Sequence, residues 1–491
     1  MSSETEKFNL FSFKEKFRIM HLSWVAFFIT FFMWMSHSSL MPLIKETFGL
    51  SSAEVSALLF LNVALTIPSR TIVGMLVDKF GPRLMFTLLL VVSGIFCIAF
   101  GMAQSYEQLA AARFLMGFSG AGFVIGIRLI TEWFPANQAG TAQGVYGGWG
   151  NFGAAGAGLV LPFLAAFFGA EEGWRSAVCS AGVVSILYAG LFYLMVSDTP
   201  KGSTYFKPKK LGPMEVTSVG DLFLYILMCA PMFIAMGVIT WRLSPAGVSL
   251  LSESVTWIIW VGLGGWFAYQ VLGIFRINRD IFSKPVPELH QYKFKQVALL
   301  NLAYMVTFGS EVAVISMLPL YFLEMYDVSV ALAGAMASTF VAMNLFARPG
   351  GGYMSDRVGR KLTLLVTVVG SGIGYLGMSF MTVDWSLGAV MTVVIFCSFF
   401  VQAGAGATFG VVPTIKRRLT GQIAGLTGAY GNVGAAIFLL VYSFTDAATL
   451  FLVVGISCAL VAVLVSLFLD EPKGHIAEIR EDGSVELITV S

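Results

Sequence analysis

Long apolar tracts recur along the whole chain, and they limit its possible folds more than any other feature. Charged residues make up only 12% of the 491 residues, about half the fraction of a soluble protein. A lipid core about 30 Å thick needs about 20 apolar residues per helix. The tracts show no alternation of apolar and polar residues, which excludes a membrane β-barrel. We identify fourteen candidate spans, near residues 19–41, 53–77, 84–103, 107–133, 139–169, 175–196, 222–241, 254–275, 296–323, 330–354, 362–382, 386–412, 420–443 and 447–469.

The sequence therefore predicts an all-α polytopic membrane protein, and its basic residues predict an orientation. Most of the 30 Lys and Arg lie in the two termini and in the even-numbered loops. Because cytoplasmic loops carry the excess of Lys and Arg, we expect both termini to be cytoplasmic and the protein to be integral to the cytoplasmic membrane. Four arginines lie inside the spans instead: Arg70, Arg113, Arg128 and Arg348.

Two motifs occur twice along the chain. The stretch "GTAQGVYGGWGNFGAA" from residue 140 matches "GQIAGLTGAYGNVGAA" from residue 421, which places Asn432 where Asn151 stands. Likewise, "SRTIVGMLVDKFGPR" (69–83) matches "ARPGGGYMSDRVGRK" (347–361), and in each an Arg precedes an Asp by eight residues. A single displacement maps six spans onto six others, so the chain is a duplicated six-helix unit.

The duplication predicts four segments. Residues 1–200 form an N-terminal six-helix bundle with a short cytoplasmic N-terminus, and residues 294–470 form a C-terminal six-helix bundle. Residues 201–293 form a linker with two additional transmembrane helices, to which we assign a peripheral, structural role. Residues 471–491 form a polar cytoplasmic tail. Because helices are inserted as a pair, the two pseudo-symmetric bundles keep the same orientation.

The repeated arginines indicate an anion site. A charged Arg at mid-bilayer costs about 2.5–3.5 kcal/mol on insertion scales, so a pair needs a compensating role. Eight residues at about 1.5 Å each place Arg70 roughly 12 Å above Asp78, and Arg348 equally far above Asp356. Two planar guanidinium groups at one depth suit a small oxyanion. The alternative is that both arginines pair with carboxylates for structure.

The same motifs resemble those of a known family. The paired "G…D-(K/R)-x-G" turns after spans 2 and 8 resemble the inter-helix signature of the major facilitator superfamily. The doubled Gly/Asn stretch resembles the nitrate signature of its nitrate/nitrite porter family. The stretches "NLFARPGGGYMSDRVGR" (344–360) and "GAGATFGVVPTIKRR" (404–418) are similar to spans of plant, algal and cyanobacterial nitrate transporters. The resemblance fails over 200–293. It implies a major-facilitator fold, with Arg70 and Arg348 binding nitrate or nitrite.

The resemblance also nominates the walls of the pocket. It implies that aromatic rings of spans 4 and 7 stack on the anion, and the matching positions here are Phe123, Tyr304 and Phe308. Aromatic walls would exclude water and lower the local dielectric constant. Asn151 and Asn432 offer carboxamide donors to an anion or to the arginines.

The remaining repeated residues suit a conformational gate. Glycines let helices approach closely in lipid, where no strong hydrophobic force drives helices together. The Gly/Asn stretches would then pivot against neighbouring spans, while the Asp/Arg turns lie where the two halves meet at the cytoplasmic end. The candidate gate residues are Asp78, Arg83, Asp356, Arg360, Gly147, Gly150, Gly428 and Gly431.

Glu311 is the candidate for coupling to protons. It shares one face of span 7 with Tyr304 and Phe308. Importing one negative charge against an inside-negative potential costs about 2.3 kcal/mol per 100 mV, so uptake needs a cation or an exchanged anion. Alternatively, Glu311 is a permanently ionised structural partner. Arg128 and Glu132, four residues apart, are expected to form a structural pair that points away from the pocket.

We therefore expect a secondary active transporter that takes up nitrate, and nitrite as well, by alternating access with protons. The alternatives are a nitrate/nitrite antiporter, a carrier of another small anion such as formate or oxalate, and a nitrate sensor or channel. The expected partners are nitrate, nitrite, protons and the lipid bilayer. The sequence shows no nucleophile arrangement, metal-ligand cluster or nucleotide loop, so we expect no enzymatic activity, no cofactor, no metal and no nucleic-acid partner.

Overall fold

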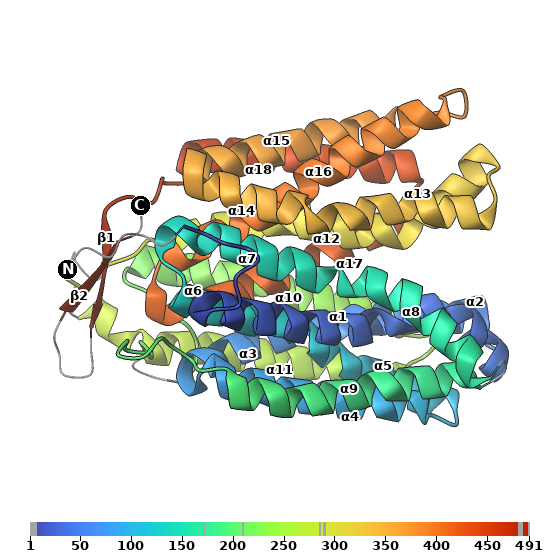
Figure 1. The fold of residues 1–491 in the computed structure, drawn as a ribbon, viewed down its shortest axis with the longest axis horizontal. Coiled ribbons are helices and arrows are strands. Elements are labelled where there is room, and N and C mark those ends of the chain that lie inside the picture. Colours follow the sequence, from blue (N-terminus) through green and yellow to red (C-terminus); the bar gives the residue numbers. More distant parts are fainter. Residues whose placement is uncertain are drawn as a thin grey trace.

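Long helices lie side by side along one axis in the computed structural model of the protein (Figure 1). The structure describes residues 7–169, 172–208, 211–283, 286–287, 291–479 and 485–489. The first half contains α1 (Glu15–Phe48), α2 (Ser52–Ala64), α3 (Thr66–Phe80), α4 (Pro82–Gly101), α5 (Tyr106–Met116), η1 (Gly117–Ala121), α6 (Gly122–Trp133), α7 (Ala136–Asn151), α8 (Gly153–Phe168) and α9 (Gly173–Met195). The inserted pair is α10 (Val219–Leu243) and α11 (Glu253–Ile277), followed by η2 (Arg279–Phe282).

The second half repeats this arrangement. It contains α12 (Phe294–Tyr326), α13 (Val330–Ala342), η4 (Met343–Leu345), α14 (Ala347–Val358), α15 (Arg360–Ser379), α16 (Leu387–Val411), η5 (Val412–Thr414), η6 (Arg417–Leu419), α17 (Thr420–Phe444) and α18 (Ala447–Phe468). The strands β1 (His475–Ile479) and β2 (Val485–Thr489) follow. The predicted all-α fold of two six-helix bundles with two extra helices is confirmed.

The second and eighth spans are both broken just before their arginine. Among the described residues, thirteen helices are long and apolar enough to cross a membrane, and α2 with α3 counts as one of them. The span expected at 330–354 is divided by η4 into two shorter helices, α13 and α14. Pro68 is the third residue of α3 and Pro349 the third residue of α14. Proline has no N–H to donate, so it is tolerated in the first turn of a helix and favours a new start there.

Two seams join the halves. Helix α3 packs against α17, and α14 packs against α7, so each arginine-bearing helix lies on a Gly/Asn helix of the other half. Figure 1 shows the β-hairpin at one end of the bundle, which we call the terminal end. The last turns of α3 and α14, which carry Asp78 and Asp356, lie at that end. The seams therefore run from the terminal end toward the middle of the bundle.

The tail forms an antiparallel hairpin at the terminal end, an element that the sequence analysis did not predict. His475 pairs with Thr489 and Ile479 with Val485. The hairpin docks on the segment between α16 and α17, where Lys416 Nζ donates to the carbonyl oxygen of Ala477 at 2.7 Å. Alternation in "VELIT" suits a strand that is half exposed, and β2 alternates between exposed and partly buried residues.

Candidate functional site

Arg70 and Arg348 lie at one site between the halves. Each is only 1% exposed. The Arg70 guanidinium carbon lies 5.6 Å from the ring centre of Phe123 and 5.3 Å from that of Phe308. The Arg348 carbon lies 6.0 Å and 5.6 Å from the same two rings. Because both guanidinium groups share these two neighbours, the repeat brings two permanent positive charges together in the interior.

The three nominated aromatic residues form one parallel set. The ring of Tyr304 lies 4.9 Å from that of Phe308 with an interplanar angle of 1°, and 6.0 Å from Phe123 with an angle of 7°. Phe409 of α16 meets the Phe123 and Tyr304 rings edge-on, at 4.5 and 4.8 Å. The sequence analysis did not nominate Phe409, although it lies inside the "GAGATFG" stretch that carried part of the resemblance.

Each arginine reaches a glycine of the opposite half. Arg70 Nη1 donates to the carbonyl oxygen of Gly428 at 2.7 Å, and Arg348 Nη1 lies 3.5 Å from the carbonyl oxygen of Gly147. A Cβ atom added at Gly428 would lie 3.2 Å from Arg70 Cδ, and one at Gly147 would lie 3.4 Å from Arg348 Cδ. The repeated glycines therefore leave room for the arginine of the other half.

Three residues further on, Gly150 and Gly431 each face an aromatic ring. A Cβ atom at Gly431 would lie 2.6 Å from Phe308 Cδ1, and a Cβ atom at Gly150 would overlap the ring of Phe27 in α1. These contacts are far tighter than a side chain tolerates. Gly150 and Gly431 thus let α7 and α17 pack closely on the first and seventh spans, as small residues do in membrane bundles.

The two asparagines are buried beside these glycines with unused hydrogen-bonding capacity. Neither Asn151 Nδ2 nor its Oδ1 has a hydrogen-bond partner among the described residues. Asn432 Nδ2 donates to the carbonyl oxygen of Gly428 at 3.3 Å, while its Oδ1 has no such partner. A buried amide without partners costs free energy. This is the property expected of a side chain that contacts a polar ligand.

Glu311 makes the site asymmetric. Its Oε1 accepts a hydrogen bond from Asn344 Nδ2 at 2.7 Å, and its Oε2 lies 3.9 Å from Arg348 Nη2. Arg70 forms no ion pair with any residue that the structure describes. Thus one of the two arginines has a carboxylate neighbour, and the two arginines together with an ionised Glu311 carry a net charge of +1.

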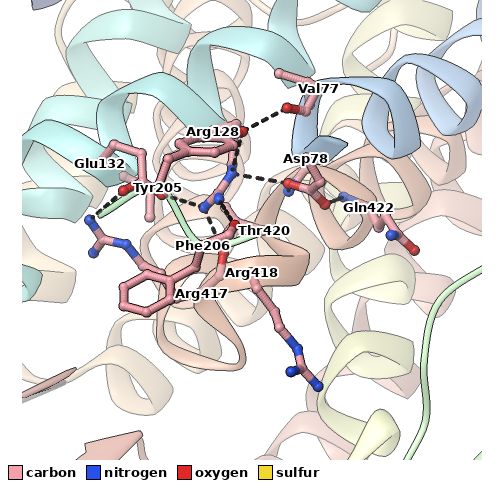
Figure 2. Close-up of polar contacts among 12 residues, drawn as sticks. Val77, Asp78, Arg128, Glu132, Tyr205, Phe206, Arg417, Arg418, Thr420 and Gln422 are labelled. Atoms are coloured by element: carbon pink, nitrogen blue, oxygen red, sulfur yellow. Dashed lines mark hydrogen bonds and ion pairs between the residues drawn. The ribbon is translucent and has the colours of Figure 1, made fainter. Parts of the chain in front are cut away.

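At the terminal end, Asp78 of α3 joins the two halves (Figure 2). Its two carboxylate oxygens accept hydrogen bonds from the backbone N–H groups of Gly421 and Gln422, both at 2.8 Å. These N–H groups belong to the first turn of α17, where the helix dipole favours a negative charge. A carboxylate of the first half therefore caps a helix of the second half.

Asp356 forms the equivalent contact at the other seam. It accepts hydrogen bonds from the N–H groups of Gly140 and Thr141 in α7, at 2.9 and 2.7 Å. Arg360 adds a second link, because its Nη2 donates to the carbonyl oxygen of Ala136 at 2.6 Å. The gate candidates Asp356 and Arg360 of the second half thus both contact the first half.

Arg83, which aligns with Lys361 in the repeat, binds within its own half. Its backbone N–H donates to Asp198 at 2.7 Å and its Nε to the carbonyl oxygen of Tyr193 at 2.8 Å. Tyr193 lies in the last turn of α9 and Asp198 follows that helix, so both partners belong to the same half. The structure therefore brings Asp78, Asp356 and Arg360 together with the opposite half and leaves Arg83 outside these contacts.

Arg128 joins the contacts at the terminal end, although the sequence analysis assigned it only to a structural pair with Glu132. The expected pair with Glu132 is present at 2.5 Å. Arg128 Nε also lies 3.0 Å from Asp78, and its Nη1 donates to the carbonyl oxygen of Arg417 in the second half at 2.6 Å (Figure 2). The linker covers this cluster, since Tyr205 Oη lies 3.2 Å from Arg128 Nε.

Comparison with known proteins first identifies the superfamily of the chain. The family model of the Major Facilitator Superfamily matches residues 23–439, and again residues 300–489. Among solved structures, the proton:xylose symporter XylE has a TM-score of 0.61 at 15% identity, with 93% of this chain and 96% of that chain covered. The human organic anion transporter MFSD10 has a TM-score of 0.61 at 12% identity, covering 92% and 100%. These two likenesses concern the fold.

Relatives with higher sequence identity then identify the family within this superfamily. The nitrate/nitrite transporter NrtP of Nostoc punctiforme is 41% identical over 489 residues, covering 98% of both chains. NrtP of Picosynechococcus is 42% identical over 522 residues, covering 97% of both chains. The probable nitrate/nitrite antiporter NarK1 of Thermus thermophilus is 26% identical, covering 94% of both. This chain belongs to the major facilitator superfamily and, within it, to the nitrate/nitrite transporter family.

Proposed function

We propose that this protein is a secondary active transporter that carries nitrate, and nitrite as a second substrate, into the cell by alternating access with protons. One observation carries the proposal. Arg70 and Arg348, from equivalent positions of the two halves, lie buried over the same Phe123 and Phe308 rings. Two relatives that are 41% and 42% identical to this chain are nitrate/nitrite transporters.

The chemistry of the site suits a small planar anion. Each guanidinium group can donate parallel N–H bonds to two oxygens of one nitrate or nitrite ion. The parallel rings of Phe123, Tyr304 and Phe308 offer flat, apolar walls for a flat and weakly hydrated ion. The unused carboxamide groups of Asn151 and Asn432 can add neutral hydrogen bonds. Water exclusion by the rings strengthens the charge-assisted bonds.

The terminal end serves as the inner gate in this proposal. With both termini in the cytoplasm, the contacts of Asp78 with α17 and of Asp356 with α7 close the cytoplasmic side. Opening to the cytoplasm separates each carboxylate from the N–H groups of the opposite half. Binding of an anion compensates the two central arginines and lets the halves close around it, so the loaded carrier passes through the occluded state more readily than the empty one.

The ion pair of Glu311 with Arg348 supports proton coupling. A proton on Glu311 removes the competing carboxylate and leaves the Arg348 guanidinium free for the anion. Release of the proton and the anion restores the pair at 3.9 Å. Proton and anion thus favour each other's binding, which is what a symporter needs.

The test is nitrate flux into proteoliposomes with an imposed pH gradient. We expect saturable uptake that an inward proton gradient drives. Arg70→Lys and Arg348→Lys remove the forked donor but keep the charge. Because a hydrogen bond to a charged group contributes about 1.5–3 kcal/mol, each should raise the KM by roughly 10- to 150-fold. Arg357→Lys is the matched control, since Arg357 is an exposed arginine on the same helix as Arg348.

The same assay separates the remaining possibilities. Formate or oxalate that competes more strongly than nitrite would identify another substrate. An ohmic current without saturation would indicate a channel. Unchanged kinetics in both central Arg→Lys variants would refute the proposed site.

Nitrate/nitrite exchange is the second candidate. An empty site retains Arg70 without any ion pair among the described residues, so a carrier that returns empty must close around that charge. Exchange avoids this step, because nitrite occupies the site on the return. The relationship to NarK1 supports the same possibility. Flux that is driven by nitrite on the opposite side and not by a pH gradient would establish exchange.

A further inference from the structure

The inserted pair of helices stands partly away from the bundle. Helix α10 packs against α12, α17 and α2, whereas α11 packs mainly against α10. Only 6% of the most apolar 18-residue stretch of α11 is buried inside the protein, compared with 39% of the equivalent stretch of α10. Two neighbouring cavities of about 450 and 640 Å³ lie between this pair and the bundle. Both are lined by Pro68, Ile72, Met236 and Trp266, so they adjoin one another.

The smaller cavity lies over a seam between the halves. Thr71 and Met75 of α3 line it from the first half, and Gln422 and Leu426 of α17 line it from the second half. Gln422 is the residue whose backbone N–H donates to Asp78 at the gate. Any molecule in this cavity therefore contacts both halves next to the gate.

The cavity combines an apolar body with a polar end. Arg276 lines it from the last turn of α11, at the terminal end, and forms no ion pair or hydrogen bond with the residues that the structure describes. Gln422 is 5% exposed, and its Oε1 has no hydrogen-bond partner within the described chain. Much of the remaining wall is aliphatic or aromatic, with Tyr269 and Leu272 of α11 on the outer side.

We propose that this cavity binds one anionic phospholipid, with its phosphate on Arg276 and an acyl chain along the apolar wall toward the larger cavity. A guanidinium group at the membrane surface is a strong phosphate ligand. The unused Gln422 oxygen accepts a hydrogen bond from a headgroup hydroxyl, which phosphatidylglycerol has and phosphatidylcholine lacks. An acyl chain fills apolar space that water would enter only at a cost in free energy.

The first test counts bound lipid. The full chain is delipidated in detergent, titrated with phosphatidylglycerol or phosphatidylcholine, and measured by native mass spectrometry. We expect one tightly bound phosphatidylglycerol and no comparable phosphatidylcholine. Arg276→Gln should weaken this binding about fivefold, the contribution of one basic residue near an anionic lipid. Arg279→Gln is the matched control, because Arg279 is exposed and lies outside the lining of both cavities.

A second pair of variants tests the apolar part. Leu272→Trp adds bulk at the cavity wall and should lower the occupancy by phosphatidylglycerol. Ile258→Trp adds the same bulk to an exposed position of α11 that lines neither cavity. Equal binding of both lipids would overturn the proposal, as would an equal loss in Arg279→Gln and Arg276→Gln. Unchanged binding in Leu272→Trp would also overturn it.

Discussion

Replacement of Asp78 by Asn should open the terminal end of the protein. The carboxylate accepts two backbone N–H groups of α17 at 2.8 Å and pairs with Arg128 at 3.0 Å. The single amide oxygen of Asn accepts one of these N–H groups, and its NH₂ group faces the other donors. A hydrogen bond to a charged group contributes about 1.5–3 kcal/mol. We therefore expect the closed state to lose about 3 kcal/mol, which changes the ratio of closed to open molecules roughly 100-fold.

Distances between spin labels measure this change directly. Phe80 at the end of α3 and Val358 at the end of α14 are exposed, one in each half, and cysteine at both positions can carry labels in a background without native cysteines. We expect a longer distance to gain population in Asp78→Asn. Asp198→Asn is the control, because Asp198 accepts from Arg83 within the first half. Identical distance distributions in the two variants would refute the capping argument.

Three further predictions concern the centre and the gate. Glu311→Gln should abolish the pH dependence of nitrate uptake while nitrite exchange persists, and an unchanged pH profile would exclude Glu311 from coupling. Gly428→Ala places a methyl group 3.2 Å from Arg70 Cδ; we expect a loss of about 1–3 kcal/mol in substrate binding or stability, measured by KM and thermal melting. Gly350→Ala, with no described atom within 4 Å of its Cβ, should be neutral. Arg128→Gln leaves the buried Asp78 carboxylate without its cation, whereas Glu132 keeps Arg417 at 3.4 Å; it should lower stability by about 3–5 kcal/mol in thermal unfolding.

The fold could be predicted from the sequence because each apolar tract marks one span and the repeat relates the halves. The breaks before Arg70 and Arg348 were not predicted, although Pro68 and Pro349 mark both. The length of an apolar tract does not distinguish a continuous helix from a broken one. The hairpin at 475–489 was also missed, since a short alternating segment carries a weak signal beside thirteen strongly apolar helices.

The candidate site could be predicted in part. Equal spacing from Asp78 and Asp356 predicted that the arginines share a depth, and the structure places them on the same rings. The contact of Glu311 with Arg348 depends on how the seventh and eighth spans rotate against each other, which sequence periodicity does not specify. The contacts of Arg128 were predicted incompletely for a similar reason. The sequence indicated Glu132, four residues away on the same helix, as its ion-pair partner, whereas its second partner, Asp78, lies on another helix.

Each central arginine has a carbonyl oxygen of the opposite half beside it, so the geometry of the site depends on the closed state of the protein. Arg70 is held by a carbonyl oxygen of α17, and Arg348 lies near one of α7, so neither is fully positioned by its own half. When the halves separate at the terminal end, these partners withdraw and the two charges lose their common geometry. We therefore expect a bound anion to be discharged in the same event that opens the gate.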